Sequence, residues 1–194
     1  MNQLALFDFD ETLTQKDTFR TFMRFAFPAD QWRWRWFCSL PDIGVYMLNK
    51  NGSRLKTRVL NRFFSDYNKV DLEAKAIEFV NWMEENPSYF KTEVLFNLMK
   101  LRDDGAEIAV VSASPELWIE PWCKRKGIRA IATKLEWSSE GKFIGLDGKN
   151  CSREEKVVRI QQEFDLSRYK RIVVYGNKGP DDAMLELGTE KHAI

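Results

Sequence analysis

The sequence contains very little cysteine and histidine. Three cysteines, Cys38, Cys123 and Cys151, occur without metal-ligand spacing, and their odd number argues against a disulfide framework. A reduced, cytoplasmic compartment is therefore the simplest expectation. The single histidine, His192, lies near the C-terminus, which argues against a multi-histidine metal site or a histidine-based catalytic triad within one chain.

The sequence also lacks an excess of charge and a long hydrophobic run. Lys plus Arg is 30 and Asp plus Glu is 29, so no overall field favours nucleic acid or a membrane. The longest apolar run, Trp36 to Leu48, is broken by Pro41 and Asp42 and is too short to cross a bilayer as a helix. No basic leader precedes an apolar segment at the N-terminus, so no secretory signal is expected.

A hydrophobic strand followed by carboxylates is the most informative feature that is present. Residues 4–7 are apolar and predict a buried strand, and Asp8, Asp10 and Thr12 follow it at alternate positions. Acidic side chains are disfavoured in strands and costly to bury unpaired. If the strand geometry continues through Asp10, both carboxylates point the same way and reach one metal ion and one substrate.

The rest of the chain divides into a helical block and an alternating block. Residues 15–104 show consecutive amphipathic helices, which favour a small bundle. After Gly105, short apolar strands alternate with helices, and residues 134–145 have the pattern of a hairpin. This alternation predicts an α/β fold with a parallel sheet. We therefore expect an α/β core of residues 1–14 and 105–194, interrupted by a helical subdomain of residues 15–104.

Three further polar segments lie at predicted strand ends. Ser112 follows the strand at 107–111 and precedes a helix, where backbone N–H groups favour phosphate. Lys156 falls about one turn into a helix and could point its ammonium group at a bound phosphate. The segment from Gly176 to Asp182 follows a buried strand and offers oxygen ligands.

Taken in order, these segments resemble the four motifs of haloacid-dehalogenase-like phosphohydrolases over nearly the whole chain. The resemblance implies a three-layer Rossmann-like core of parallel strands, with the helical block in the position of an inserted C1 cap. The sequences of these motifs are most similar to those of the phosphoserine-phosphatase-like branch, subfamily IB. Within that branch the chain is similar to phosphatidylglycerophosphatase C and other small bacterial phosphatases. The segments that carry this similarity are Asp-Thr-Phe at 17–19, Asn150-Cys151, Glu155-Lys156-Val157 and Met184-Leu185.

The resemblance also implies roles for individual residues. Asp8 would attack phosphorus and form an aspartyl-phosphate, and Asp10 would protonate the leaving alcohol and then activate water. Thr12 would support the site. The phosphoryl oxygens would be held by Ser112, Ala113 and Lys156.

Magnesium is the cofactor that the resemblance implies, with one departure from the family pattern. The ion would be held by Asp8, the main-chain carbonyl of Asp10, Asn177 and Asp181. The family's fourth motif usually begins Gly-Asp, whereas this chain has Gly176-Asn177. Mg²⁺ needs only one or two carboxylates and keeps several waters, so weaker binding is expected rather than none. Asp181 matches the second acid of the motif by spacing, and Asp182 is the neighbour that could substitute.

The predicted function is a magnesium-dependent hydrolase of a small-molecule or lipid phosphomonoester, without a nucleic-acid partner. One alternative is a lipid-phosphate phosphatase at a membrane surface. Another is a non-catalytic phospho-ligand binding protein, because of Asn177. Neither the particular phosphomonoester nor the oligomeric state follows from the sequence.

Tryptophan and arginine alternate in residues 31–37. Three tryptophans and two arginines in this segment suit peripheral contact with a membrane interface or an anionic lipid. The alternative, which we prefer on sequence grounds, is an insert core with snorkelling arginines.

Overall fold

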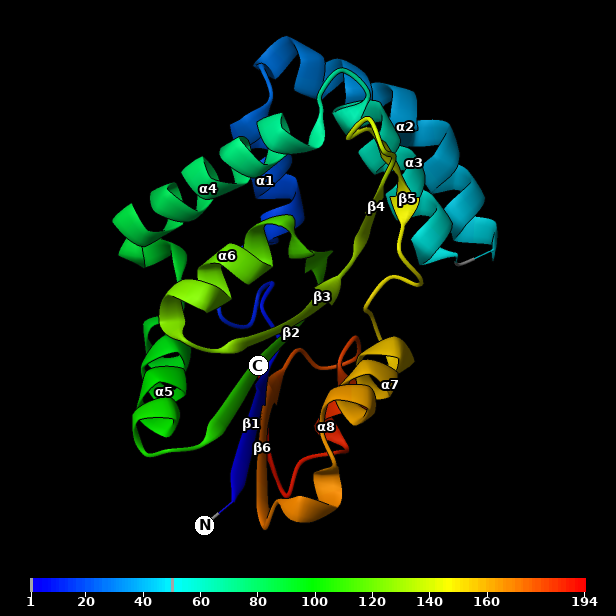
Figure 1. Cartoon of the computed structure of the whole chain (residues 1–194). Coiled ribbons are helices and arrows are strands. Elements are labelled where there is room, and N and C mark those ends of the chain that lie inside the picture. Colours follow the sequence, from blue (N-terminus) through cyan, green and yellow to red (C-terminus); the bar gives the residue numbers. More distant parts are fainter. Residues whose placement is uncertain (1, 50) are drawn as a thin grey trace.

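A five-stranded parallel sheet forms the centre of the protein (Figure 1). The structure is a computed structural model that describes residues 2–49 and 51–194. Met1 and Lys50, which fall within the predicted core and helical block, lie outside the described residues. The strands occur in the order β3-β2-β1-β6-β7. Their bounds are β1 (Gln3–Phe7), β2 (Glu107–Pro115), β3 (Arg129–Thr133), β6 (Arg171–Gly176) and β7 (Glu190–Ala193).

Helices cover both faces of this sheet, which gives the predicted three layers. Two apolar clusters separate the layers: alternate residues of β1 face opposite sides, with Ala5 and Phe7 in one cluster and Leu4 and Leu6 in the other. The first cluster is covered by α5 (Thr92–Asp103) and α6 (Glu116–Lys126), and the second by α7 (Glu154–Glu163) and α8 (Asp182–Leu185). Two short 3-10 helices, η1 (Pro87–Tyr89) and η2 (Leu166–Arg168), complete the core connections.

A helical insert of four helices follows β1 and lies beyond the carboxyl ends of the strands (Figure 1). Its members are α1 (Thr18–Ala26), α2 (Ala29–Asn49), α3 (Gly52–Phe64) and α4 (Lys69–Glu85). The antiparallel hairpin of β4 (Leu135–Trp137) and β5 (Phe143–Leu146) reaches up from the core and packs against α3. This hairpin is the one predicted from residues 134–145.

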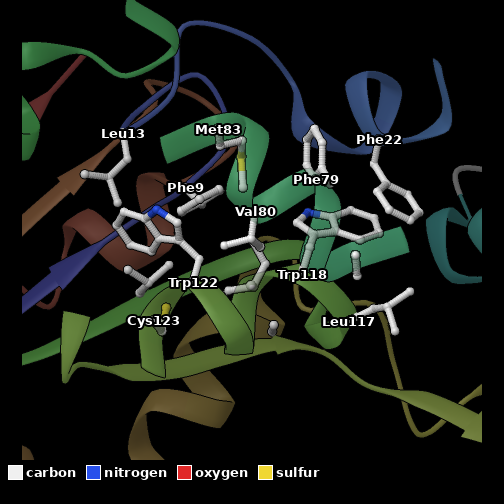
Figure 2. Packing of buried hydrophobic residues seen from close by; sticks show 14 of the residues in the cluster. Phe9, Leu13, Phe22, Phe79, Val80, Met83, Leu117, Trp118, Trp122 and Cys123 are labelled. Carbon is white, nitrogen blue, oxygen red and sulfur yellow. The ribbon is translucent and has the colours of Figure 1, made fainter. Parts of the chain in front are cut away.

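An aromatic core joins the insert to α6 and to the loop after β1 (Figure 2). Phe22 of α1 stacks on Trp118 of α6, with ring centroids 4.5 Å apart. Phe9, in the loop after β1, meets Trp122 edge-on at 5.0 Å. Because Phe9 is anchored in this way, the acidic residues on either side of it have fixed positions.

The division between core and insert is marked by backbone hydrogen bonds. The chain leaves the core at Thr14 and returns at Phe90, and these two residues form an isolated antiparallel bridge. Helix α5 packs against β1 and β2. The predicted boundary at residue 104 stays a prediction, and these contacts favour a boundary nearer to residue 90.

One element differs from the sequence expectations. Strand β2 continues through Ser112 to Pro115 with a register shift, whereas a strand ending at Val111 was expected. Helix α2 continues through Pro41, the residue that breaks the apolar run in the sequence. Within the described parts of the chain, no helix is both long and apolar enough to cross a membrane.

Candidate active site

Asp8 lies at the carboxyl end of β1, between the two neighbouring strands β2 and β6. The Nζ atom of Lys156 donates to Asp8 Oδ1 at 2.6 Å, and Thr12 Oγ1 donates to Asp8 Oδ2 at 2.7 Å. All three side chains are buried. The lysine and the threonine therefore fix the plane of the Asp8 carboxylate.

Burial dominates the electrostatics of this carboxylate. Burial raises the pKa of Asp8 to about 6; the Lys156 cation lowers it, and the nearby Asp181 and Asp10 charges raise it. Burial alone would lower the pKa of Lys156, but the attraction of Asp8 and Asp181 outweighs it and raises that pKa. At neutral pH, Asp8 is thus mostly ionised and faces a protonated lysine.

Asp181 completes the ion cluster from the loop after β6. Its Oδ1 accepts from Lys156 Nζ at 2.7 Å, and its Oδ2 accepts from the backbone N–H of Asn177 at 2.8 Å. A Cβ atom on Gly176 would lie 2.8 Å from the Cβ of Asp181, so this close approach requires glycine. Asp182 is exposed and instead accepts from the backbone N–H of Gly179.

The side chain of Asn177 lies between the two oxygens expected to hold a metal. Its Nδ2 atom donates to the main-chain carbonyl of Asp10 at 2.8 Å and to Asp8 Oδ2 at 3.3 Å. A rotation of the amide by half a turn would exchange its nitrogen for an oxygen at the same position. In the described arrangement, the amide N–H group provides the positive end of a dipole next to these two oxygens.

Asp10 has a different set of partners from Asp8. Its Oδ1 accepts from the backbone N–H of Thr18 at 2.6 Å and from the Thr18 hydroxyl at 2.5 Å. Its Oδ2 accepts from Ser114 at 2.6 Å and from Ser112 at 3.1 Å. Strand β1 ends at Phe7, and Glu11 adopts a left-handed backbone with φ of 58°, so the extended geometry expected through Asp10 does not persist. The condition stated for the two carboxylates, a strand that continues through Asp10, is therefore not met, and their action on one substrate stays a prediction.

The predicted phosphate-binding segment lies beside Asp10. The Ser112 hydroxyl also accepts from the backbone N–H of Ser114 at 2.9 Å. The carbonyl of Ala113 accepts from Thr133 at 2.7 Å and from the ammonium group of Lys56. The structure thus brings Ser112 and Ala113 next to the acidic cluster, and their roles in binding phosphate stay predictions.

Lys56 was not among the predicted site residues. It extends from α3 of the insert to the Ala113 carbonyl, and its Nζ atom lies 5.3 Å from the centroid of the Phe19 ring. Burial lowers the pKa of Lys56 to about 8, although the Asp10 and Asp17 charges oppose this shift. The sequence feature that could have identified Lys56 is its position on the apolar face of α3, one turn before Val59 and Leu60.

Thr18 and Ser114 were also missed. Thr18 is the first residue of α1 and is fully buried, and its hydroxyl also accepts from the indole N–H of Trp118 at 3.1 Å. The available signal was Asp17, whose side chain caps α1 and thereby places Thr18 at the helix N-terminus. For Ser114, the signal was its position two residues after Ser112 in an extended segment.

The donor atoms next to Asp8 suit a hard cation that needs few carboxylates. Within residues 2–49 and 51–194, no three His, Cys, Asp or Glu side chains form a metal-binding group. The converging donors are instead Asp8 Oδ2, the carbonyl of Asp10 and the amide of Asn177. Mg²⁺ accepts such oxygen ligands together with waters, so these residues fit magnesium. Asp181 is held by Lys156 and the Asn177 backbone.

Two aspartates follow the first central strand, and a helical insert comes directly after them. This arrangement is typical of one class of hydrolases. The model of the haloacid dehalogenase-like hydrolase family matches residues 5–186. The chain therefore belongs to the haloacid dehalogenase-like hydrolases, which confirms the family predicted from the sequence motifs.

The chain is also similar to individual proteins. Protein CicA of Caulobacter vibrioides is 30% identical over 190 residues, which cover 97% of this chain and 84% of CicA. A solved structure from Bordetella pertussis Tohama I, of unknown function, has a TM-score of 0.76 at 21% identity and covers 97% of this chain and 88% of that one. A phosphoserine phosphohydrolase-like protein from Francisella tularensis subsp. tularensis SCHU S4 has a TM-score of 0.61 at 18% identity, covering 98% and 84%. These two structures share the predicted fold.

Proposed function

We propose that the protein is a magnesium-dependent phosphomonoester hydrolase that works through an aspartyl-phosphate on Asp8. The observation that carries this proposal is the buried Asp8 carboxylate, held by Lys156 at 2.6 Å and by Thr12 at 2.7 Å at the end of the central strand. A binding protein has no need for an oriented nucleophile, whereas covalent catalysis requires one.

The reaction divides into two displacements. Asp8 attacks phosphorus, the bond to the alcohol oxygen breaks, and Asp10 gives its proton to that oxygen. Asp10 then accepts a proton from water, whose oxygen attacks the phosphoryl group and releases inorganic phosphate with Asp8 regenerated. Lys156, already protonated, offsets the negative charge that accumulates on the phosphoryl oxygens.

The hydroxyl groups around Asp10 suit both of its protonation states. An ionised carboxylate only accepts hydrogen bonds, whereas a protonated one donates one. Ser112, Ser114 and Thr18 carry hydroxyls that can either donate or accept, so each can turn when Asp10 gains or loses its proton. This arrangement supports a residue that acts first as an acid and then as a base.

Magnesium would be held by Asp8, the Asp10 carbonyl and the side chain of Asn177. When bound, the ion offsets the repulsion between an anionic carboxylate and an anionic phosphate ester. A purified-enzyme screen across sugar, amino-acid, nucleotide and lipid phosphates, with and without Mg²⁺, tests the proposal. We expect release of inorganic phosphate that EDTA abolishes and Mg²⁺ restores. Absence of phosphate release from every class would contradict the proposal.

The substitution Asn177→Asp should tighten Mg²⁺ binding. The new carboxylate would lie next to Asp8 Oδ2 and the Asp10 carbonyl, which the Asn177 amide now contacts through its N–H group. Without a cation, these oxygens repel one another, and with Mg²⁺ the added charge attracts the ion. We therefore expect the variant to melt at a lower temperature than the parent in EDTA and to show a larger rise in melting temperature when Mg²⁺ is added. Its half-maximal activity should need about tenfold less Mg²⁺ than that of the parent, which corresponds to about 1.4 kcal/mol of binding free energy.

Two results would argue against this assignment. An unchanged Mg²⁺ requirement would place the ion elsewhere, for example on Asp181 or Asp182. If the parent is inactive on every phosphate and Asn177→Asp is active, the non-catalytic alternative gains support. Asp182→Asn tests one of these alternatives: Asp182 is exposed and accepts from the backbone N–H of Gly179, so an unchanged Mg²⁺ requirement in this variant would exclude it as the ligand.

Lys56 should contribute to binding an anionic substrate. Its cation lies beside the predicted phosphate-binding segment, and a hydrogen bond to a charged group contributes about 1.5–3 kcal/mol. The variant Lys56→Met should therefore raise KM by about 10- to 100-fold with a smaller change in kcat. Because burial lowers the pKa of Lys56 to about 8, its charge is present below that pH and is lost above it. The kcat/KM of the parent should accordingly fall as the pH rises above about 8.

Lys56→Arg is the matched control for charge. Arginine remains protonated throughout this range, so the decline above pH 8 should disappear in this variant. Measurement of kcat/KM from pH 6 to 10 for the parent and both variants checks the prediction. If Lys56→Met keeps the alkaline decline of the parent, another group is responsible for it.

A further inference from the structure

From Arg35 onward, helix α2 has its charged side chains turned inward, whereas Asp30 and Arg33 in its first turns are exposed. Arg35 is buried, donates to the backbone carbonyls of Arg62 and Phe63 at 2.6 Å each, and pairs with Asp66 at 2.5 Å. Asp42 is also buried, and the guanidinium groups of Arg58 and Arg62 pair with it. Inside the insert, Trp32 and Trp36 pack against the apolar core.

The opposite side of α2 is apolar and exposed. We call this side the α2 outer face, and its large side chains are Trp34, Phe37, Leu40, Val45, Met47 and Leu48. The rings of Trp34 and Phe37 stack with centroids 5.9 Å apart, and their side chains are 65% and 63% exposed. The other exposed residues between positions 34 and 48 are a proline and a glycine. Figure 1 shows α2 at the outer margin of the insert, with α3 against its inner side.

This face offers almost no hydrogen-bonding side chains. From residue 34 to residue 48, the indole N–H of Trp34 is its one polar side-chain group among the exposed positions. Interfaces between proteins carry about one hydrogen bond per 100–200 Å², and their rims are polar. An acyl-chain environment requires no such bonds, and tryptophan and phenylalanine are favoured at its boundary with water.

Arginines border the α2 outer face. Arg33 precedes Trp34 on the exposed side of the helix, and Arg54 and Arg58 line a small hollow together with Val45. Asp42 carries one negative charge but pairs with two arginines, Arg58 and Arg62. One positive charge of this group is therefore left without a matching negative charge. Asp30, which is exposed one turn before Trp34, offsets one of these positive charges. The border as a whole stays positive, which complements an anionic surface.

We propose that the α2 outer face docks on an anionic lipid bilayer. The helix lies in the interface with its aromatic and aliphatic side chains among the upper acyl chains, while the bordering arginines contact lipid phosphates. A second copy of the chain is a poorer occupant, because two such faces would bring like-charged borders together. Because Arg35 and Asp42 are paired inward, the part of the face between residues 34 and 48 has no exposed charge that would have to be desolvated.

Vesicle co-sedimentation of the whole protein tests this proposal without reference to turnover. The vesicles are phosphatidylcholine alone, and phosphatidylcholine mixed with phosphatidylglycerol. We expect the parent to bind the anionic vesicles, to bind neutral vesicles at least tenfold less, and to be released by high salt. Phe37→Glu should lower binding at least tenfold. Phe96→Glu is the matched control, since Phe96 lies on α5 and is 65% exposed.

A second measurement uses Trp34, the tryptophan at the N-terminal end of the face. Vesicles with brominated acyl chains should quench part of the parent's fluorescence, and Trp34→Phe should lose that quenching while still binding. The proposal is overturned if the parent does not bind anionic vesicles, if Phe37→Glu binds as the parent does, or if Phe96→Glu is equally impaired. Dimerisation that Phe37→Glu abolishes, in the absence of vesicle binding, would assign the face to a second copy instead. Thermal unfolding confirms that each variant is folded.

Discussion

Asp8→Asn should abolish phosphate release while the protein still folds. An amide is not a competent phosphoryl acceptor, so kcat should fall on the order of 10⁴-fold or more. The fold should persist because Lys156 retains its contact with Asp181 at 2.7 Å, and the amide oxygen can still accept from Thr12. Steady-state kinetics and acid-quench mass spectrometry, which detects the phosphorylated protein, check this result.

The pH dependence of stability gives an independent signature of Asp8. Its folded pKa of about 6 lies above its usual value of 3.8, so the folded protein binds more protons between these pH values. The contribution of this group to stability is therefore full below pH 3.8 and is lost as the pH rises to about 6. Asp8→Asn should lack that decline. A variant that melts within about 4 °C of the parent yet keeps near-parent turnover would refute the nucleophile assignment.

Asp10→Asn should lower kcat by about 10²–10⁴-fold, the usual contribution of general acid–base catalysis. The fold should tolerate the amide, because its oxygen can replace Oδ1 towards Thr18. Its NH₂ group can donate to the hydroxyls of Ser112 and Ser114, which are able to accept. The loss should be largest for substrates whose leaving alcohol has a high pKa.

The dependence on the leaving group separates an acid role from a structural one. With p-nitrophenyl phosphate, the first displacement needs little proton transfer, so Asp10→Asn should form the phosphorylated protein at close to the parent's rate. Rapid-quench measurement of that first turnover is the decisive comparison. An equal deficit for good and poor leaving groups, with phosphorylation limiting in both, would remove the acid role. Ser114→Ala, which deletes one hydrogen bond to Asp10, is the control for positioning alone.

The acidic centre of the site could be predicted from the sequence because each part lies at a strand end. Carboxyl ends of parallel strands meet at one edge of a sheet, so Asp8 and the loop containing Asn177 had to be neighbours once β1 and β6 were paired. Lys156 followed from its place in the first turn of a helix behind that edge. The partners of Asp10 could not be predicted in this way, because they come from α1 of the insert and from the end of β2.

A lysine on the apolar face of a helix was a signal that the sequence offered for two of the site residues. Lys156 precedes Ile160 by one turn and both are buried, and Lys56 precedes Val59 and Leu60 on the apolar face of α3. A lysine on the solvated face of a helix leaves the apolar face uninterrupted and needs no particular partner. A lysine on an apolar face needs an anionic or carbonyl partner, and both of these lysines have one.

Strand β7, in contrast, could not be predicted from the pattern of its own residues. Its residues, Glu190–Ala193, contain no apolar run, and their exposure alternates along the edge of the sheet. The segment becomes a strand because it pairs with β6 and because His192 stacks on Tyr175 with centroids 4.2 Å apart. Such an element is determined by its neighbour, and its own residues give no periodic signal.

The bridge between Thr14 and Phe90 gives the protein a modular construction. Backbone hydrogen bonds of 2.8 Å join Gln15 to Tyr89 and Lys91 to Leu13, so the insert leaves and re-enters the core at one point. Domain insertions are tolerated where the two ends of the added segment lie together, because the host chain's course is unchanged. Lengthening, shortening or exchange of the insert can therefore alter what enters the site while the strand that carries Asp8 keeps its place. Diversification of specificity within this architecture requires the two adjacent junctions to be preserved, together with the contacts of Thr18 with Asp10 and of Phe22 with Trp118.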